Sequence, residues 1–261
     1  MKTKKVKFKS LKYKITGEIN LPNNLKGKLP AVILFHGLTN TRKDCPLINK
    51  ASQALVKNGI IAFRIDFFGS GESDGEMREK RFNILEQNAK DAIKFITKLS
   101  FVDHSRLGLW GRSFGGTFVS LIPPSKNIKA RVIASPGIII EKTMADKFKK
   151  LKKREKELNK IGKKLAGTGK YKGAYELDVG WFTSLRGVDK RIVNNLKRMK
   201  NTLVLGISND EKVTLNDICT AINFVKEPKK IVIYNTGHDF AGYENKAIKE
   251  TVSWFRKYLS Y

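Results

Sequence analysis

The chain has 261 residues, of which 41% are hydrophobic, so it can bury one large core and suits a single α/β domain. No apolar run approaches the roughly 20 residues that a membrane-spanning helix needs, and the lysine-rich N-terminus lacks the apolar stretch of a secretory signal. The 52 Lys+Arg against 24 Asp+Glu give a formal net charge of +28, but the basic residues are mostly lysine and occur in nearly every segment. This distribution predicts a solvated lysine-rich surface rather than a specific nucleic-acid site.

Cysteine usage points to a reducing compartment. The two cysteines, Cys45 and Cys219, have neither the spacing of metal ligands nor the density of a disulfide scaffold. We therefore expect reduced thiols, a cytoplasmic protein and no bound metal. No segment has the spacing of a phosphate-binding loop or a dinucleotide-binding motif, so we expect no cofactor either.

Apolar segments alternate between strand-like and helical patterns along the chain. Strand-like segments are Lys5–Lys9, Tyr13–Leu21, Ala31–Phe35, Ile60–Phe67, Arg106–Trp110, Arg131–Ala134, Thr202–Ile207 and Lys230–Tyr234. Helical spacing is found over Pro46–Lys57, Phe82–Leu99 and from about Glu244 to Tyr258. This order predicts an α/β fold with an eight-stranded, mostly parallel sheet, helices on both faces and an antiparallel N-terminal pair at one edge.

Residues 138–200 interrupt this alternation between the sixth and seventh strands. Apolar residues keep helical spacing from Met144 to Leu165, and a glycine-punctuated stretch with four aromatic residues follows. Insertions of this length inside a compact domain are usually functional or disordered. We predict a lid over the active site at 138–200 and a core domain made of 1–137 and 201–261; a loosely packed surface helix is the alternative. The lid residues expected to contact substrate are Tyr171, Tyr175, Trp181 and Phe182.

A serine lies in a tight strand-to-helix turn. Gly111-x-Ser113-x-Gly115 follows the apolar strand that ends near Trp110 and matches the pattern of a nucleophile elbow. In such a turn the serine hydroxyl is lifted out of the sheet at a helix N-terminus, where negative charge is favoured. The pattern by itself is weak, because composition alone produces it by chance in roughly one chain in ten of this length. Whether Ser113 is a nucleophile therefore depends on whether the chain supplies a base and an acid for it.

A serine nucleophile needs a base, and the chain has three histidines. His238 follows the last strand at the carboxyl edge, where open α/β sheets place their active sites. His36 ends the third strand and is expected to be structural, and His104 precedes the fifth strand at the opposite edge. Topology therefore favours His238 as the base.

The imidazole needs an acid, and the segment after the seventh strand supplies one. Asp210 completes the order serine, aspartate, histidine that this kind of fold uses. Glu211 and Asp217 are neighbouring carboxylates that leave the choice open, and a turn-forming aspartate is the simpler explanation of Asp210. We predict Asp210.

A tetrahedral intermediate also needs donors to its oxyanion. The backbone N–H groups of Leu38, in the turn after His36, and of Phe114, next to Ser113, are available by position. The glycine-rich segment 66–75 is expected to be a tight structural loop beside the site.

Four segments together resemble the serine α/β-hydrolases: residues 35–40, 66–75, 108–116 and 237–240. The most similar group is that of the bacterial cinnamoyl and feruloyl esterases, and the likeness runs from about residue 11 to 259. It implies Ser113 as nucleophile, His238 as base, Asp210 as acid, Leu38 and Phe114 as oxyanion donors, and a lid between strands six and seven. Arg112 stands where histidine is common in the elbow.

These observations predict a serine carboxylesterase that cleaves a small-molecule ester through an acyl-enzyme intermediate. The same triad would serve an acyl-peptidase, an aminopeptidase-like enzyme or a thioesterase. A protein of another class, an inactive hydrolase fold that binds anionic lipid or nucleic acid through its charge, is a further alternative. We expect no membrane span and no specific nucleic-acid partner, and a homodimer is possible.

Overall fold

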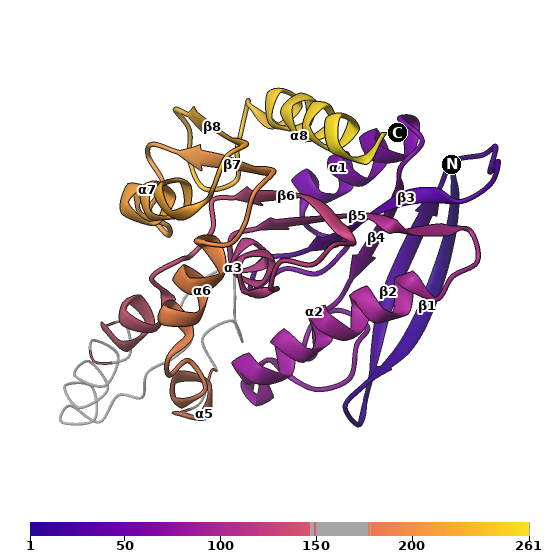
Figure 1. Cartoon of the computed structure of the whole chain (residues 1–261). Coiled ribbons are helices and arrows are strands. Elements are labelled where there is room, and N and C mark those ends of the chain that lie inside the picture. The colour runs from indigo at the N-terminus through magenta and orange to yellow at the C-terminus, as the bar shows by residue number, and fades with distance from the viewer. Residues whose placement is uncertain (147–148, 150–176, 178, 261) are drawn as a thin grey trace.

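The computed structural model describes every residue except 147–148, 150–176, 178 and 261 (Figure 1). The described residues form one sheet of eight strands in the order β1-β2-β4-β3-β5-β6-β7-β8. Their bounds are β1 Lys2–Ser10, β2 Tyr13–Leu21, β3 Leu29–Phe35, β4 Ile61–Ile65, β5 Val102–Arg112, β6 Ile128–Ala134, β7 Thr202–Ile207 and β8 Lys229–Tyr234. The predicted eight-stranded sheet is confirmed.

Strand direction also follows the prediction. The β1–β2 and β2–β4 pairs are antiparallel, and all pairs from β4 through β3 to β8 are parallel. Because the parallel strands point the same way, their carboxyl ends lie at one edge of the sheet. One expectation was wrong: His104 lies within β5, which begins at Val102, rather than before it. It is exposed near the start of that strand, away from the carboxyl ends.

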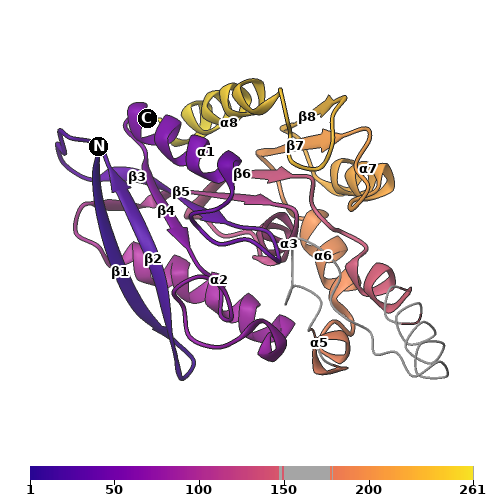
Figure 2. The same cartoon turned by 180° about the vertical axis from the view of Figure 1, so that it is seen from behind.

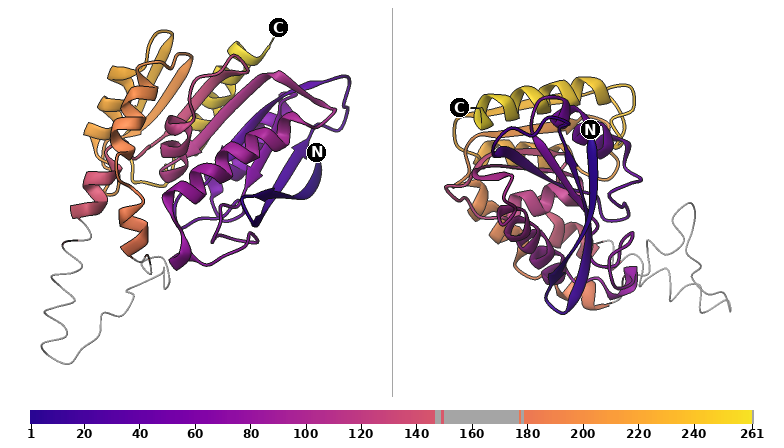
Figure 3. Two further views of the ribbon diagram at one scale, coloured as in Figure 1. Left: turned by 60° about the horizontal axis from the view of Figure 1, so that its bottom comes forward. Right: turned by 90° about the vertical axis from the view of Figure 1, so that its right-hand side faces the viewer.

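Helices cover both faces of the sheet (Figures 1 and 2). Residues of α1 (Pro46–Lys57) and α8 (Glu244–Leu259) pack in one hydrophobic cluster. A second cluster on the other face takes residues from α2 (Phe82–Thr97), α3 (Phe114–Leu121), α6 (Val188–Leu196) and α7 (Leu215–Phe224). Figure 3 shows the layers from two other directions, with α8 and α2 on opposite sides of the sheet. The amphipathic spacing of each helix explains this arrangement, since each presents one apolar stripe to the sheet.

The predicted insertion is described only at its two ends. Its C-terminal end holds the short helix α5 (Val179–Thr183) and α6, whose Val188, Ile192 and Leu196 are buried in the main core. Helix α6 was not predicted from the sequence, although these three positions are spaced four residues apart. Tyr171 and Tyr175 lie outside the described residues, so the division into core and lid stays a prediction. Among the helices that the structure describes, none has both the length and the apolar character required to cross a bilayer.

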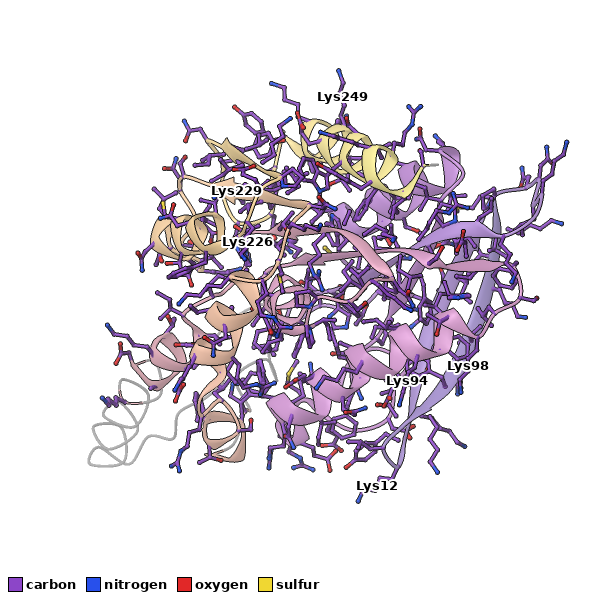
Figure 4. The ribbon with its side chains drawn as sticks, in the orientation of Figure 1. Lys12, Lys94, Lys98, Lys226, Lys229 and Lys249 are labelled. Carbon is purple, nitrogen blue, oxygen red and sulfur yellow. The ribbon has the colours of Figure 1, made fainter. Side chains whose placement is uncertain are left out.

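The lysines are distributed over several elements (Figure 4). Labelled examples lie at the β1–β2 turn (Lys12), on α2 (Lys94), at the end of α2 (Lys98), around β8 (Lys226 and Lys229) and on α8 (Lys249). All of these are exposed except Lys229, which is partly buried and donates to the Ile222 carbonyl oxygen at 2.9 Å. Side chains of this kind keep their ammonium groups in water.

One lysine behaves differently. Lys80, which follows the short 3-10 helix η1 (Met77–Glu79), is 1% exposed. Its ammonium group donates to the Leu38 carbonyl oxygen at 2.9 Å and to Ser70 Oγ at 2.7 Å. Burial lowers the pKa of Lys80 to about 7, against the opposing attraction of the Asp66 carboxylate. Lys80 therefore joins the glycine-rich loop at 66–75 to the turn that follows β3.

The loop itself is held by a buried ion pair. The Asp66 carboxylate accepts from the backbone N–H of Arg42 at 2.7 Å and of Glu72 at 3.0 Å, and it pairs with the Arg42 guanidinium. Gly71 has a φ of +53°, and a Cβ there would meet the Asp66 carboxylate at 2.3 Å. The segment is a tight structural loop, as its glycine content predicts.

A pH dependence follows from Lys80. Its pKa is lowered from 10.5 to about 7 in the folded chain, so the unfolded chain binds more protons between these two values and stability rises with pH across that window. Lys80→Met should therefore remove part of the increase in unfolding free energy that wild type shows from about pH 7 to about pH 10. Urea denaturation at several pH values measures this slope. Lys98→Met is the control, because the Lys98 ammonium is in water in both states; equal slopes for Lys80→Met and wild type would contradict the expectation.

Candidate active site

The turn between β5 and α3 carries Ser113 in a strained conformation. Its φ of 54° and ψ of −122° lie in a region that residues with a side chain rarely adopt. Neighbouring glycines make the turn possible: a Cβ at Gly111 would lie 2.2 Å from the Gly115 carbonyl oxygen, and one at Gly115 would lie 2.1 Å from that of Phe35. The Ser113 N–H donates to the Ala134 carbonyl oxygen at 2.8 Å. The backbone at Ser113 thus has the sharp strand-to-helix turn that the sequence predicts.

Three of the predicted residues form a hydrogen-bonded chain. His238 Nε2 lies 3.1 Å from Ser113 Oγ, and His238 Nδ1 lies 2.7 and 2.9 Å from the two oxygens of Asp210. The carboxylate can only accept at neutral pH, so Nδ1 carries a proton, and in the neutral ring Nε2 is then the acceptor for the serine hydroxyl. Asp210 follows β7 and His238 follows β8, which brings them together from strands that are neighbours in the sheet.

Asp210 is also held by its own turn. Its Oδ1 accepts from the backbone N–H of Lys212 at 2.8 Å and of Val213 at 3.0 Å, so the simpler turn-forming explanation is correct as well. Its Oδ2 accepts from the Ser135 hydroxyl at 2.6 Å. Burial alone would raise the pKa of Asp210, but the hydrogen bonds from His238, Ser135 and the Lys212 N–H outweigh it and lower that pKa to about 2.

The two neighbouring carboxylates lie elsewhere. Asp217 is buried on α7, where its Oδ1 accepts from the backbone N–H groups of Ile138 and Ile139 at 2.8 Å and its Oδ2 accepts from Thr214. Glu211 is exposed. Asp210 is therefore the carboxylate of the three that contacts His238.

Leu38 and Phe114, whose backbone N–H groups are the predicted oxyanion donors, lie with Ser113 on the wall of one cavity. Phe114 is the first residue of α3, where a backbone N–H has no partner inside the helix. Leu38 lies in a turn fixed by the Asn40 N–H donating to the Gly37 carbonyl oxygen at 3.2 Å and by Lys80 on the Leu38 carbonyl oxygen.

His36 anchors the same turn. It is buried, its Nδ1 donates to the Gly37 carbonyl oxygen at 2.6 Å, and its Nε2 accepts from the Phe67 N–H at 3.1 Å. Burial lowers the pKa of His36 to about 3, so the ring is neutral and can accept at Nε2. The structural role expected for His36 agrees with these contacts.

Arg112 has a role that was not predicted from the sequence. Its buried guanidinium donates to the His238 carbonyl oxygen at 2.8 Å and pairs with the exposed Asp239. The elbow residue before Ser113 thus holds the loop that carries His238. The sequence contains no signal for this contact, because 126 residues separate the two positions.

A cavity of about 450 Å³ opens beside Ser113 and His238. The apolar side chains on its wall are Leu38, Phe114, Ile139, Ile140, Met144, Leu177, Phe182 and Val213. Phe182, a predicted lid residue, is among them. Trp181 is not: it is 0% exposed and packs in the core against Phe114, with ring centroids 5.3 Å apart. The expectation that Trp181 contacts substrate is corrected by this burial.

Comparison with known proteins agrees with this architecture. A family model, Hydrolase_4, described as serine aminopeptidase, S33, matches residues 28–195. The quorum-quenching protein AidA of Acinetobacter baumannii is 30% identical over 107 residues, which are 40% of this chain and 34% of that protein. A putative carboxymethylenebutenolidase of Aquifex aeolicus is 26% identical over 121 residues, 43% of this chain and 51% of that protein.

An uncharacterised 31.7 kDa protein of Escherichia coli, encoded in the traX-finO intergenic region, is 33% identical over 92 residues. The match spans 35% of this chain and 32% of that protein. The chain thus covers about a third of the length of the E. coli relatives that it matches.

Solved structures match over nearly the whole chain. Est1E from Butyrivibrio proteoclasticus with bound ferulic acid has a TM-score of 0.75 at 18% identity, covering 98% of this chain and 100% of that one. The complex of DcsB with a substrate analogue has a TM-score of 0.74 at 18% identity, covering 100% of both chains. Likeness at this level of identity establishes the fold. The family match covers more than half of the chain and the described sheet has the α/β-hydrolase strand order, so this protein belongs to the serine aminopeptidase (S33) family, Hydrolase_4, of the α/β-hydrolases.

Proposed function

We propose that the protein is a serine hydrolase that cleaves carboxylic esters of small molecules, with Ser113 as nucleophile, His238 as base and Asp210 as acid. The observation that carries this proposal is the hydrogen-bonded chain of these three side chains beside an apolar cavity. The aspartate keeps the imidazole in the tautomer whose Nε2 lone pair faces the serine hydroxyl.

Acylation starts at Ser113 Oγ. The oxygen attacks the ester carbonyl carbon while its proton passes to His238 Nε2, and the carbonyl oxygen becomes an oxyanion. The backbone N–H groups of Leu38 and Phe114 are the proposed donors to this oxyanion, each worth about 3–4 kcal/mol in such chemistry. The ester C–O bond then breaks, Nε2–H gives its proton to the leaving alcohol oxygen, and the acyl group remains on Ser113.

Deacylation uses the same groups with water. Nε2 of His238 takes a proton from a water molecule, whose oxygen attacks the acyl carbon. When the second tetrahedral intermediate collapses, the proton on Nε2 returns to Ser113 Oγ and the carboxylic acid leaves. The products are one alcohol and one carboxylic acid, and the enzyme regains its starting state.

The charges around the cavity favour an ester over an amino-terminal peptide. An aminopeptidase needs a carboxylate for the ammonium group of its substrate. Of the acidic residues on the described cavity wall, Asp217 is occupied by Ile138, Ile139 and Thr214, and Asp239 pairs with Arg112. The family description keeps aminopeptidase activity as the second candidate.

The described wall of the cavity favours a neutral, apolar acyl group. Its side chains are mainly aliphatic and aromatic, and the volume is in the range of small-molecule sites. Apart from Arg112, which is paired, the cation on this wall is the exposed Lys212. Ile139, Ile140 and Phe182 belong to the described ends of segment 138–200, so we propose that this segment contributes part of the acyl site.

Labelling with a fluorophosphonate tests the nucleophile. Wild type should be labelled and Ser113→Ala should not, because the reagent reacts with an activated serine oxygen. A parallel panel of an ester, a thioester and an aminoacyl anilide should show ester turnover. Turnover of the anilide alone would make the aminopeptidase the better description. No labelling of wild type, together with salt-dependent binding of nucleic acid or anionic lipid, would favour the inactive binding protein.

Acyl chain length tests the cavity. In a series of p-nitrophenyl esters, kcat/KM should rise by about fourfold per methylene group until the cavity is full, since burial of each is worth about 0.8 kcal/mol. The hemisuccinate should react more slowly than a neutral ester of equal length. Phe182→Ala should reduce the gain per methylene, and Phe224→Ala, an exposed phenylalanine outside the cavity wall, should not. A hemisuccinate preference would contradict the apolar acyl site.

Two aspartates allow a matched test of the acid. Asp210→Asn should lower kcat by roughly 10⁴-fold, because an amide lets the imidazole adopt the other tautomer. Asp217→Asn should lower the thermal midpoint, through its contacts with Ile138 and Ile139, and change kcat by less than about tenfold. Steady-state kinetics and thermal unfolding of the two variants measure this contrast. Similar losses of kcat in both would speak against Asp210 as the acid.

A further inference from the structure

Ser135 occupies a strained position directly after β6. It is 0% exposed, and its φ of 44° lies in the left-handed region that favours glycine. Its backbone N–H donates to the Leu205 carbonyl oxygen of β7 at 2.7 Å, which holds the residue in this conformation. A side chain is thus present at a position where its backbone geometry carries a cost that glycine would not have.

The hydroxyl of this residue contacts the carboxylate of the proposed triad. Ser135 Oγ donates to Asp210 Oδ2 at 2.6 Å, and the same oxygen lies 2.7 Å from His238 Nδ1. The other described donors to this carboxylate, the N–H groups of Lys212 and Val213, belong to the turn of Asp210 itself. They fix the carboxylate within its turn, whereas Ser135 fixes it relative to another strand.

The end of β6 contacts both ends of the hydrogen-bonded chain. The Ala134 carbonyl oxygen accepts from the Ser113 N–H at 2.8 Å, and the next residue, Ser135, donates to Asp210. The last residue of β6 and the residue that follows it therefore set the separation between serine and aspartate that the imidazole spans. A free rotation of the Asp210 carboxylate would change the direction in which His238 Nε2 points.

We infer that Ser135 is a positioning residue that fixes the orientation of the Asp210 carboxylate. Through this carboxylate it keeps the His238 ring oriented with Nε2 toward Ser113 Oγ. This inference rests on the proposed serine hydrolase function. Ser135 is not among the residues on the cavity wall, so it acts through Asp210 and does not touch the substrate.

Two substitutions of the same residue separate positioning from stability. Ser135→Ala and Ser135→Gly both remove the hydroxyl, and Ser135→Gly also relieves the positive φ. Both should lower the rate of fluorophosphonate labelling and kcat roughly tenfold, the effect of one lost hydrogen bond to a charged group, with KM for a neutral ester unchanged. Ser135→Gly should unfold at a higher temperature than Ser135→Ala. Ser52→Ala is the control, because it removes another buried serine hydroxyl, which donates to Asn20 at 2.8 Å.

The pH profile is the readout that a purely structural role would not move. A carboxylate that loses a donor attracts the imidazolium more strongly, so the acid limb of the labelling rate should move to higher pH in both variants. Among the described residues of the cavity wall, the other charged groups are Lys212 on the Asp210 turn, Arg112 at the end of β5, Asp217 on α7 and Asp239 beside His238, and none of them is altered.

The outcomes are distinguishable. If wild type is labelled and both Ser135 variants match it in rate and in pH profile, the positioning role is overturned while the proposed function stands. If wild type is not labelled, the proposed function fails. The low-field proton NMR signal of His238 Nδ1–H then still tests the contact: it should shift in both Ser135 variants and not in Ser52→Ala, and an unchanged signal overturns the inference.

Discussion

The close approach of α3 to the ends of β3 and β5 is the constraint on which the site depends. At Gly115 the helix backbone lies so near the Phe35 carbonyl oxygen that a Cβ would be 2.1 Å away from it. The helix begins at Phe114, directly after the positive φ of Ser113, and Phe114 and Leu38 both lie on the cavity wall. A bulkier residue at 115 would push α3 away from β3. Ser113 and the Phe114 N–H would then move away from the turn that carries Leu38.

Around this contact, polar side chains join loops that are distant in sequence. Lys80 holds the Leu38 turn, Arg112 holds the His238 loop, and Ser135 holds Asp210. Each is buried and each donates to an oxygen of a different loop, which is how buried polar groups avoid the cost of losing water. The loops at the carboxyl edge of the sheet are thereby fixed relative to one another, and for the proposed reaction such a site would need little reorganisation when charge develops on the substrate.

The net charge of +28 has little part in this arrangement. Most lysines of the described residues are exposed and lie on several elements, whereas the described wall of the cavity is mainly apolar. The surface charge therefore concerns solubility and attraction of anions in general, and the proposed selectivity for a neutral acyl group depends on the side chains that line the cavity. The described ends of segment 138–200 contribute to this proposed selectivity, because Ile139, Ile140 and Phe182 lie on the cavity wall.

The sequence by itself determined the strands, the helices α1, α2 and α8, and the local turns. Periodicity predicted the strands and their succession along the chain, with the bounds of β2, β7 and α1 as the structure has them. The glycines around Ser113 predicted its turn, because backbone and side-chain sterics act over a few residues. Tertiary structure decided which groups meet. Asp210 rather than Asp217 contacts His238, Trp181 is buried while Phe182 lines the cavity, and Ser135, Lys80 and Arg112 reach partners 42 to 126 residues away. Such contacts depend on how strands and helices pack in three dimensions, and residue type and spacing along one chain do not specify that packing.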